Sequence, residues 1–219
     1  LGAEELHVGF GGPEGDRVQV LRGASLSVDA GELVALEAPS GEGKTVLATL
    51  LLLLRRPDSG VVRWSGLDVT RRSPRALQSL RAQHQGLLQH TGANLPPYMT
   101  LRALLVETVE RVGGALGDAM TIAEVLGLGP LLDRSSRHLS GGEQRRAGLA
   151  RVLAARPAFV LLDEPDAGLD PTSVLAAIDA VRSAVDGGMG CLLVTHNRSA
   201  ARRVADRRLA LRQGVLHAV

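Results

Sequence analysis

The sequence predicts an α/β fold with a β-rich N-terminal part and an inserted α-helical segment. Three features support this prediction. The glycine-containing segment 38–46 joins a short apolar run to a helix-favouring run. Two later apolar runs, 159–162 and 191–195, end beside acidic or imidazole side chains. A block of helical patterns at about 91–138 has strand patterns on both sides, which favours an insert in an α/β core over a separate downstream domain.

Length and composition narrow the class of protein. We expect a single domain over residues 1–219, with 1–90 and 139–219 as its core. The net charge of +2 gives no indication of a nucleic-acid partner. Cys191 is the only cysteine, so we expect a buried thiol, no internal disulfide and a reducing compartment. No run approaches the ~20 apolar residues that span a bilayer, and no secretory signal is visible, so we expect a soluble protein.

The N-terminal part reads as short strands separated by glycine-containing turns, at 6–10, 18–21, 24–28 and 33–36. Phe10 ends the first of these runs and is one of two phenylalanines in the chain. A ring at this position can stack on an adenine face, an interaction worth roughly 1–3 kcal/mol per base. It can equally be an edge or core residue of the sheet.

The segment 38–46, read APSGEGKTV, has the strand, glycine loop and helix context that a phosphate-binding loop requires. Such a loop turns backbone N–H groups toward phosphate oxygens at a helix N-terminus, and Gly41 and Gly43 let the backbone come close. Lys44 would reach the β and γ phosphates, and the Thr45 hydroxyl would bind Mg²⁺. The pattern predicts a P-loop NTPase core whose nucleotide-binding residues are Ala38, Pro39, Ser40, Gly41, Glu42, Gly43, Lys44, Thr45 and Val46.

Lys44 is the only lysine among 25 basic residues. A chain that uses arginine everywhere else keeps a slim ammonium at the one place where a planar guanidinium would not fit. The alternative, a glycine-rich turn before an ordinary helix, does not account for this choice. Ala38 stands where the full pattern has glycine, and we expect little effect if its φ stays negative.

Between this loop and the insert, the patterns predict a strand at 60–64, a helix from Pro74 to about Arg81, and a short strand at 86–89. Gln89 ends that strand and on its own is an ordinary strand-end amide. Helical runs follow at 101–112, 118–126 and 130–134, interrupted by glycines.

A capping box follows the insert. Ser140 is the predicted N-cap of a helix that runs to about Ala155, and Glu143 stands three residues later to reach back. A bare S-x-x-E pattern is usually structural. Gly141 and Gly142 lie inside this one, and they leave the first turn without side chains, so that a phosphate could approach its N–H groups.

Polar residues follow both of the later strands, at the edge where α/β folds bind ligands. Asp163 at the end of 159–162 is placed to hold Mg²⁺, and Glu164 to polarise an attacking water. Asp170 precedes Pro171 as the predicted N-cap of the next helix. His196 follows the strand at 191–195, which we take as the last buried strand; alone, such a histidine is more often a satisfied core residue.

With these motifs in order, the chain resembles the nucleotide-binding subunit of an ABC transporter over nearly its whole length. The segment 38–45 resembles Walker A, 139–143 the LSGGE signature, and 159–163 Walker B. Signature and Walker B at this spacing are highly specific, whereas Walker A alone is shared by many NTPases. By position, the remaining motifs are an A-loop aromatic, a Q-loop glutamine, a catalytic glutamate, a D-loop and a switch histidine, carried by Phe10, Gln89, Glu164, 167–170 and His196.

The chain departs from the family pattern at three positions. Ala38 replaces the first Walker A glycine, and Phe10 stands where tyrosine is usual. Asp166 stands where threonine or serine is common, and the sequence offers no functional account of it. None of these departures removes a catalytic group.

The resemblance implies Mg²⁺-dependent ATP hydrolysis at a site shared by two chains. One chain's Ser140 and Gly142 would complete a site whose Lys44 comes from a second cassette, in a homodimer or heterodimer. Glu164 would orient the water, and Gln89 and His196 would sense the γ-phosphate. The implied catalytic residues are Glu164, His196 and Lys44. The implied Mg²⁺ ligands are Thr45, Gln89 and Asp163, and the other implied ATP contacts are Phe10, Ser140, Gly141, Gly142, Glu143 and Asp170.

The resemblance also implies transmembrane permease subunits as partners, no nucleic acid, and a place on the cytoplasmic face of the cell membrane. The segment 94–100, read NLPPYMT, resembles cassettes of the oligopeptide, nickel and phosphonate import group, which would add a solute-binding protein. Another transported substrate is the second hypothesis. A non-transport ABC-type ATPase of DNA repair or translation is the third, although its usual coiled coils, zinc modules and tandem cassettes have no counterpart here.

Overall fold

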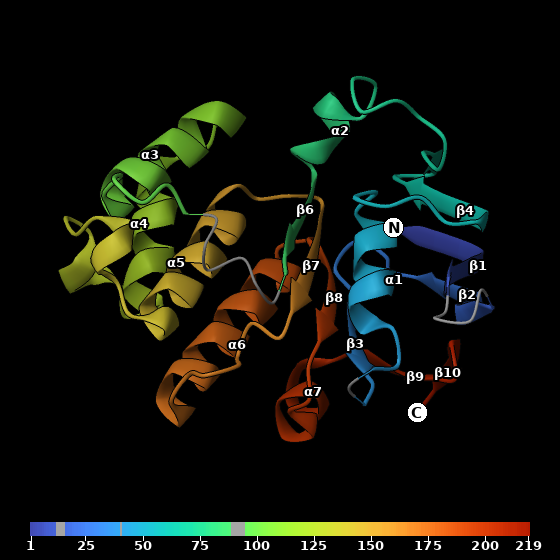
Figure 1. Cartoon of the computed structure of the whole chain (residues 1–219). Helices are drawn as coiled ribbons and strands as arrows, with labels where there is room; N and C mark the ends of the chain where they lie inside the picture. The colour runs from blue at the N-terminus through green and yellow to red at the C-terminus, as the bar shows by residue number, and fades with distance from the viewer. Residues whose placement is uncertain (12–15, 40, 89–94) are drawn as a thin grey trace.

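The computed structural model describes residues 1–11, 16–39, 41–88 and 95–219, and two sheets organise them (Figure 1). The smaller sheet is antiparallel, with the order β2-β1-β4-β5. Its strands are β1 (Gly2–Gly11), β2 (Arg17–Ser27), β4 (Ser59–Trp64) and β5 (Leu67–Asp68). The larger sheet has the order β10-β9-β3-β8-β7-β6. Its strands are β3 (Leu33–Glu37), β6 (His84–Leu87), β7 (Phe159–Asp163), β8 (Gly190–Val194), β9 (Arg207–Arg212) and β10 (Val215–Ala218).

Helices cover both faces of the larger sheet. Its pairs are parallel from β9 through β6, and β10 is antiparallel to β9. Helix α1 (Lys44–Leu51) lies on the face turned toward the smaller sheet, and the other long helices lie on the opposite face (Figure 1). These are α3 (Leu101–Val112), α4 (Leu116–Val125), α5 (Gly141–Ala154), α6 (Pro171–Asp186) and α7 (Arg198–Val204), while the short α2 (Gln78–Arg81) precedes β6.

The central strands are apolar throughout because they serve two hydrophobic cores. All five residues of β7 are buried, and side chains alternate across a strand. Val160 and Leu162 join the core formed with α3 to α7. Phe159 and Leu161 join the second core, which contains α1 and the smaller sheet. This double burial explains why β7 and β8 read as continuous apolar runs rather than alternating ones.

The predicted α/β class is confirmed, and several boundaries match, notably 101–112 and the helix after Ser140. Other expectations were wrong. The strands expected at 18–21 and 24–28 form one strand, β2, because Gly23 carries the chain through the gap at a φ of 82°. The helix expected from Pro74 begins only at Gln78, and 130–134 is replaced by a single 3₁₀ turn at Gly129–Leu131.

The strand at 191–195 is not the last one. Helix α7 and strands β9 and β10 follow it, and β9 pairs in parallel with β3. Strand β9 (Arg207–Arg212) was not predicted because its arginines interrupt the apolar pattern, although three residues of the strand are buried. Cys191 is buried as expected, and burial raises the pKa of its thiol. Among the described residues, no helix has the length and apolarity needed to cross a bilayer.

Gly60 provides a test of how the two antiparallel strands β1 and β4 fit together. Its φ is 98°, and a Cβ built there would lie 2.3 Å from the Glu5 carbonyl oxygen, at an irregularity of β1. Gly66 also has a positive φ, 79°, but its Cβ would meet no atom within 4 Å. Gly66→Ala should therefore cost about 1–2 kcal/mol from backbone strain alone, whereas Gly60→Ala should cost clearly more.

Urea unfolding of both variants, with an unchanged m value, measures this difference. Equal losses of unfolding free energy in the two variants would contradict the close approach of β1 to Gly60.

Candidate nucleotide site

Three adjacent parallel strands end at one edge of the larger sheet and bring the predicted site residues together. The order β3-β8-β7 places the end of β8 between the other two. Ala38 follows β3, His196 follows β8, and Glu164 follows β7. Because neighbouring strands lie ≈ 4.8 Å apart, side chains from all three strand ends can reach one point.

The loop after β3 has the backbone that a phosphate-binding loop needs. Gly41 and Gly43 have φ values of 87° and 95°, and Gly43 is the N-cap of α1. Among the described residues, Ala38 is not one of those with a positive φ, so its side chain fits the position where glycine was expected. Glu42 was not expected to have a structural role, yet its Oε2 accepts a 2.7 Å hydrogen bond from the backbone N–H of Gln213. This bond ties the loop to the β9–β10 turn.

Lys44 is almost buried, with 9% of its surface exposed. Its Nζ donates to the carbonyl oxygens of Ala38 at 2.8 Å and Pro39 at 3.1 Å. The same Nζ lies 3.1 Å from Nε2 of His196. The ammonium is therefore held within the loop, beside the histidine of a neighbouring strand.

His196 joins this lysine to the carboxylate after β7. Its Nε2 lies 2.8 Å from Oε1 of Glu164. A lysine ammonium can only donate a hydrogen bond, and an ionised carboxylate can only accept one. The single nitrogen Nε2 either carries a proton, and then donates to Glu164, or presents a lone pair to Lys44. The two neighbours thus compete for one atom.

Backbone geometry aims Glu164 into this site. Its φ is 50°, which is unusual for a residue other than glycine, and its N–H donates to the Val194 carbonyl at 2.8 Å. The side chain of Glu164 is only 11% exposed. Strained backbone of this kind persists where the surrounding structure holds it and is concentrated at functional sites.

The residues expected to hold Mg²⁺ supply only oxygen. Asp163 is buried at the end of β7, and Thr45 is in the first turn of α1. No group of three or more histidine, cysteine or acidic side chains is placed to hold a metal in the part of the chain that the structure describes. This donor set fits Mg²⁺, which usually keeps several waters and takes one or two protein ligands together with substrate phosphates.

The predicted capping box is present at the start of α5. The Ser140 N–H donates to Oε2 of Glu143 at 2.6 Å, and the Glu143 N–H donates to the Ser140 hydroxyl at 3.4 Å. The bond from the Ser140 backbone lowers the pKa of Glu143. Gly141 has open space around it, as expected for a bare first turn. Helix α5 lies on the opposite face of the sheet from α1 (Figure 1).

Two further predicted site residues have contacts of their own, and two others fall outside the described residues. Asp170 caps α6, accepting from the Ser173 N–H at 3.0 Å. Phe10 is partly buried at the end of β1, and the Arg55 guanidinium carbon lies 4.0 Å from its ring centroid. Ser40 and Gln89 fall outside the described residues.

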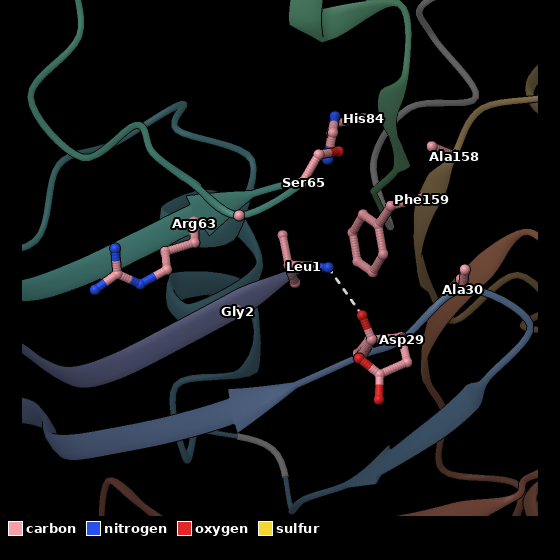
Figure 2. Close-up of a pocket in the computed structure, with 12 residues that line it drawn as sticks. Leu1, Gly2, Asp29, Ala30, Arg63, Ser65, His84, Ala158 and Phe159 are labelled. Atoms are coloured by element: carbon pink, nitrogen blue, oxygen red, sulfur yellow. Dashed lines mark hydrogen bonds between the residues drawn. The ribbon is translucent and has the colours of Figure 1, made fainter.

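Two cavities lie at opposite edges of the sheet. One of about 310 Å³ adjoins the site and is lined in part by Ala38, Pro39, Thr195 and His196. Figure 2 shows the other, which is lined in part by Ala158 and Phe159, where β7 begins. Of the predicted site residues that the structure describes, none lines this second cavity, whereas Ala38, Pro39 and His196 line the first.

Comparisons with known proteins show the family of this chain. A family model described as ABC transporter matches residues 21–167. The lipoprotein-releasing system ATP-binding protein LolD 1 of Rhodospirillum rubrum is 37% identical over 90% of this chain and 88% of its own length. The phosphate import ATP-binding protein PstB 2 of Natronomonas pharaonis is 38% identical over 91% and 74%. The dimeric ATP-binding cassette MJ0796, bound to ADP and Pi, superposes with a TM-score of 0.86 at 23% identity, covering 99% of this chain and 96% of that one.

The fold is that of an ATP-binding cassette. The chain belongs to the ABC transporter family, as one of its ATP-binding subunits. The predicted ATPase activity coupled to transport is thereby confirmed. The expected nearness to the oligopeptide, nickel and phosphonate group is not supported, because these relatives are named for lipoprotein release and phosphate import. The short stretch after Gln89 was too weak a signal to identify a transport group.

Protonation of Glu143 should weaken the start of α5. The folded state lowers the pKa of Glu143 below its ordinary value of 4.5, so its contribution to stability is present above pH 4.5. That contribution is lost as the pH falls through the lowered pKa. Glu143→Gln keeps an N3 side chain that suits a capping box but cannot titrate, so it should reduce the loss of unfolding free energy between pH 7 and pH 3.

Urea unfolding of parent and variant at both pH values isolates this residue from the other carboxylates. An identical pH dependence in the two proteins would contradict the role given to Glu143.

Proposed function

We propose that this chain binds ATP with Mg²⁺ at the edge formed by β3, β8 and β7, and hydrolyses it with Glu164 as the general base. The observation that carries this proposal is the meeting of Lys44, His196 and Glu164 at one point. They come from three strand ends that are far apart in the sequence. A base, a charged donor and a histidine in mutual contact are typical of an active site.

Each residue then has a distinct task. Lys44 exchanges the carbonyls of Ala38 and Pro39 for phosphate oxygens, since a charged acceptor makes the stronger bond. Glu164 accepts a proton from the attacking water, and His196 holds that carboxylate in place through Nε2. The N–H groups of 41–46 cradle the phosphates. Thr45 and Asp163 would hold Mg²⁺, with Gln89 as a third ligand, and the ion would neutralise developing phosphate charge.

We further propose that two cassettes share each site. Helix α5 lies on the far face of the sheet from α1, so the bare turn at Gly141 and Gly142 cannot close over the loop of its own chain without a large rearrangement. A second chain can present that turn instead, in a homodimer or a heterodimer. Ser140, Glu143 and the Asp170 turn would then border the partner's nucleotide, while Phe10 stacks on the adenine.

The membrane side of the assembly is also a proposal. We assign the core to 1–90 and 139–219 and the helical insert to about 91–138, because β6 and β7 pair although the insert separates them in the sequence. Transmembrane permease subunits on the cytoplasmic face would supply the attachment. The printed names of the relatives include both release and import, so a solute-binding protein is proposed only for the importing case. No observation favours a non-transport ATPase.

Lys44→Ala should abolish most ATP hydrolysis. No other lysine exists to take over, and removal of one donor from a transition-state oxyanion typically costs about 10²–10³-fold in kcat. Lys44→Arg should fail as well, because the buried position holds an ammonium between two carbonyls. Phosphate release measures hydrolysis, and binding of a fluorescent ATP analogue measures nucleotide affinity.

Arg75→Ala is the matched control, since it removes an exposed cation and should leave the rate unchanged. Hydrolysis by Lys44→Ala at the parent rate would contradict the assignment.

Glu164→Gln should separate binding from hydrolysis. The amide keeps the size of the side chain and removes the base, so we expect a loss of roughly 10²–10⁴-fold in rate and accumulation of an ATP-bound dimer. Light scattering with ATP and Mg²⁺, compared with ADP, detects it. Adding Ser140→Arg to the same chain should abolish the dimer. A Glu164→Gln protein that stays monomeric with ATP, even when its membrane and cassette partners are supplied, would contradict the shared site.

A further inference from the structure

Asp166 is the departure from the family pattern for which the sequence offered no account. It stands two residues after Glu164, half-buried in the turn that follows β7. Both of its carboxylate oxygens lie 3.2 Å from the hydroxyl oxygen of Thr195. Thr195 directly follows β8, is 1% exposed, and directly precedes His196.

The donor and acceptor roles of the Thr195 hydroxyl are fixed by its neighbours. Its hydroxyl accepts from the Asn197 N–H at 3.0 Å, and a hydroxyl has only one proton to give. An ionised carboxylate accepts and never donates, so this proton points to Asp166. Asn197 in turn caps α7, because its Oδ1 accepts from the Ala200 N–H at 3.0 Å. A serine or threonine at position 166 could donate or accept, and would not fix this direction.

Hydrogen bonds on the residues before His196 connect the turn of His196 to β3 and to the turn of Glu164. The Thr195 N–H donates to the Leu36 carbonyl at 3.3 Å, which fastens the end of β8 to β3. The Glu164 N–H donates to the Val194 carbonyl at 2.8 Å. The bond between Thr195 and Asp166 adds a side-chain link beyond these backbone bonds, at the residue next to the histidine.

We propose that Asp166 is a positioning residue for hydrolysis. Through Thr195 it holds the turn of His196 at a fixed distance from the turn of Glu164, which places Nε2 of His196 2.8 Å from the Glu164 carboxylate. This inference rests on the proposed function. It extends that function to Asp166, which would act only through the alignment of His196 and Glu164.

Three substitutions test the link. Thr195→Val keeps the shape of the side chain and removes the hydroxyl; Asp166→Leu removes the acceptor at similar size; Asp166→Asn keeps an acceptor. The first two should each lower kcat for ATP about 10- to 100-fold, the range expected when reacting groups are misplaced by about 1 Å. The KM for ATP should stay within about twofold, because the phosphate loop is untouched. Asp166→Asn should retain activity within about threefold of the parent.

The double variant Asp166→Leu with Thr195→Val should be no slower than either single variant, since both remove the same bond. Asp179→Leu is the matched control, because Asp179 is an exposed aspartate paired with Arg203 and lies on α6 away from the site. It should leave kcat unchanged.

Several outcomes would overturn the proposal: parental kcat in Thr195→Val, losses that multiply in the double variant, or a loss confined to KM. If Asp166→Leu does not fold, as judged by urea unfolding, Thr195→Val and Asp166→Asn decide the question by themselves. A parent protein that does not hydrolyse ATP would refute the proposed function instead. An active parent with an unaffected Thr195→Val refutes only the role of Asp166.

Discussion

One ring nitrogen, Nε2 of His196, is the point at which the three central strands converge. Lys44 lies 3.1 Å from it on one side and Glu164 lies 2.8 Å from it on the other. The strand order β3-β8-β7 is what allows this, because it places the histidine between the loop of the lysine and the turn of the glutamate. Because Nε2 can donate to Glu164 or accept from Lys44 but not do both, the two hydrogen bonds exclude each other.

This competition between Lys44 and Glu164 for Nε2 predicts a local change in hydrogen bonding when nucleotide binds. Phosphate oxygens are charged acceptors and hold an ammonium more strongly than a neutral ring does, so Lys44 should leave His196 when ATP enters. Nε2 would then bond only to the Glu164 carboxylate, which we propose activates the attacking water. The surrounding contacts keep the backbone in place during this exchange: Glu42 ties the loop to Gln213, and Asp166 ties the turn after β7 to Thr195. The local rearrangement therefore needs little movement of the sheet.

The sequence predicted those features that depend on a few neighbouring residues. The glycine loop around Gly43, the capping box of Ser140 and the cap of Asp170 follow from local chemistry. In the structure Gly43 has a positive φ, and both caps are present. Features that join distant segments were not predictable. The bond between Glu42 and Gln213 spans 171 positions. Strand β9 could not be predicted from its own residues, because what identifies it as a strand is its pairing with β3. Thr195 had one signal, a polar residue at the end of a buried strand, but its partner Asp166 could not be identified without the strand order.

The protonation state of Nε2 is the most direct test of this account. Nitrogen-15 NMR of the imidazole rings can follow it, and the His196 signal among the six histidines is assigned by its loss in His196→Gln. Without nucleotide, the ring proton should exchange between Nε2 and Nδ1, because Glu164 favours the tautomer with the proton on Nε2 and Lys44 favours the other. A non-hydrolysable ATP analogue with Mg²⁺ should shift the ring to the tautomer with the proton on Nε2, and Lys44→Met should do so without nucleotide. An Nε2 signal that neither the analogue nor Lys44→Met changes would contradict the competition between Lys44 and Glu164.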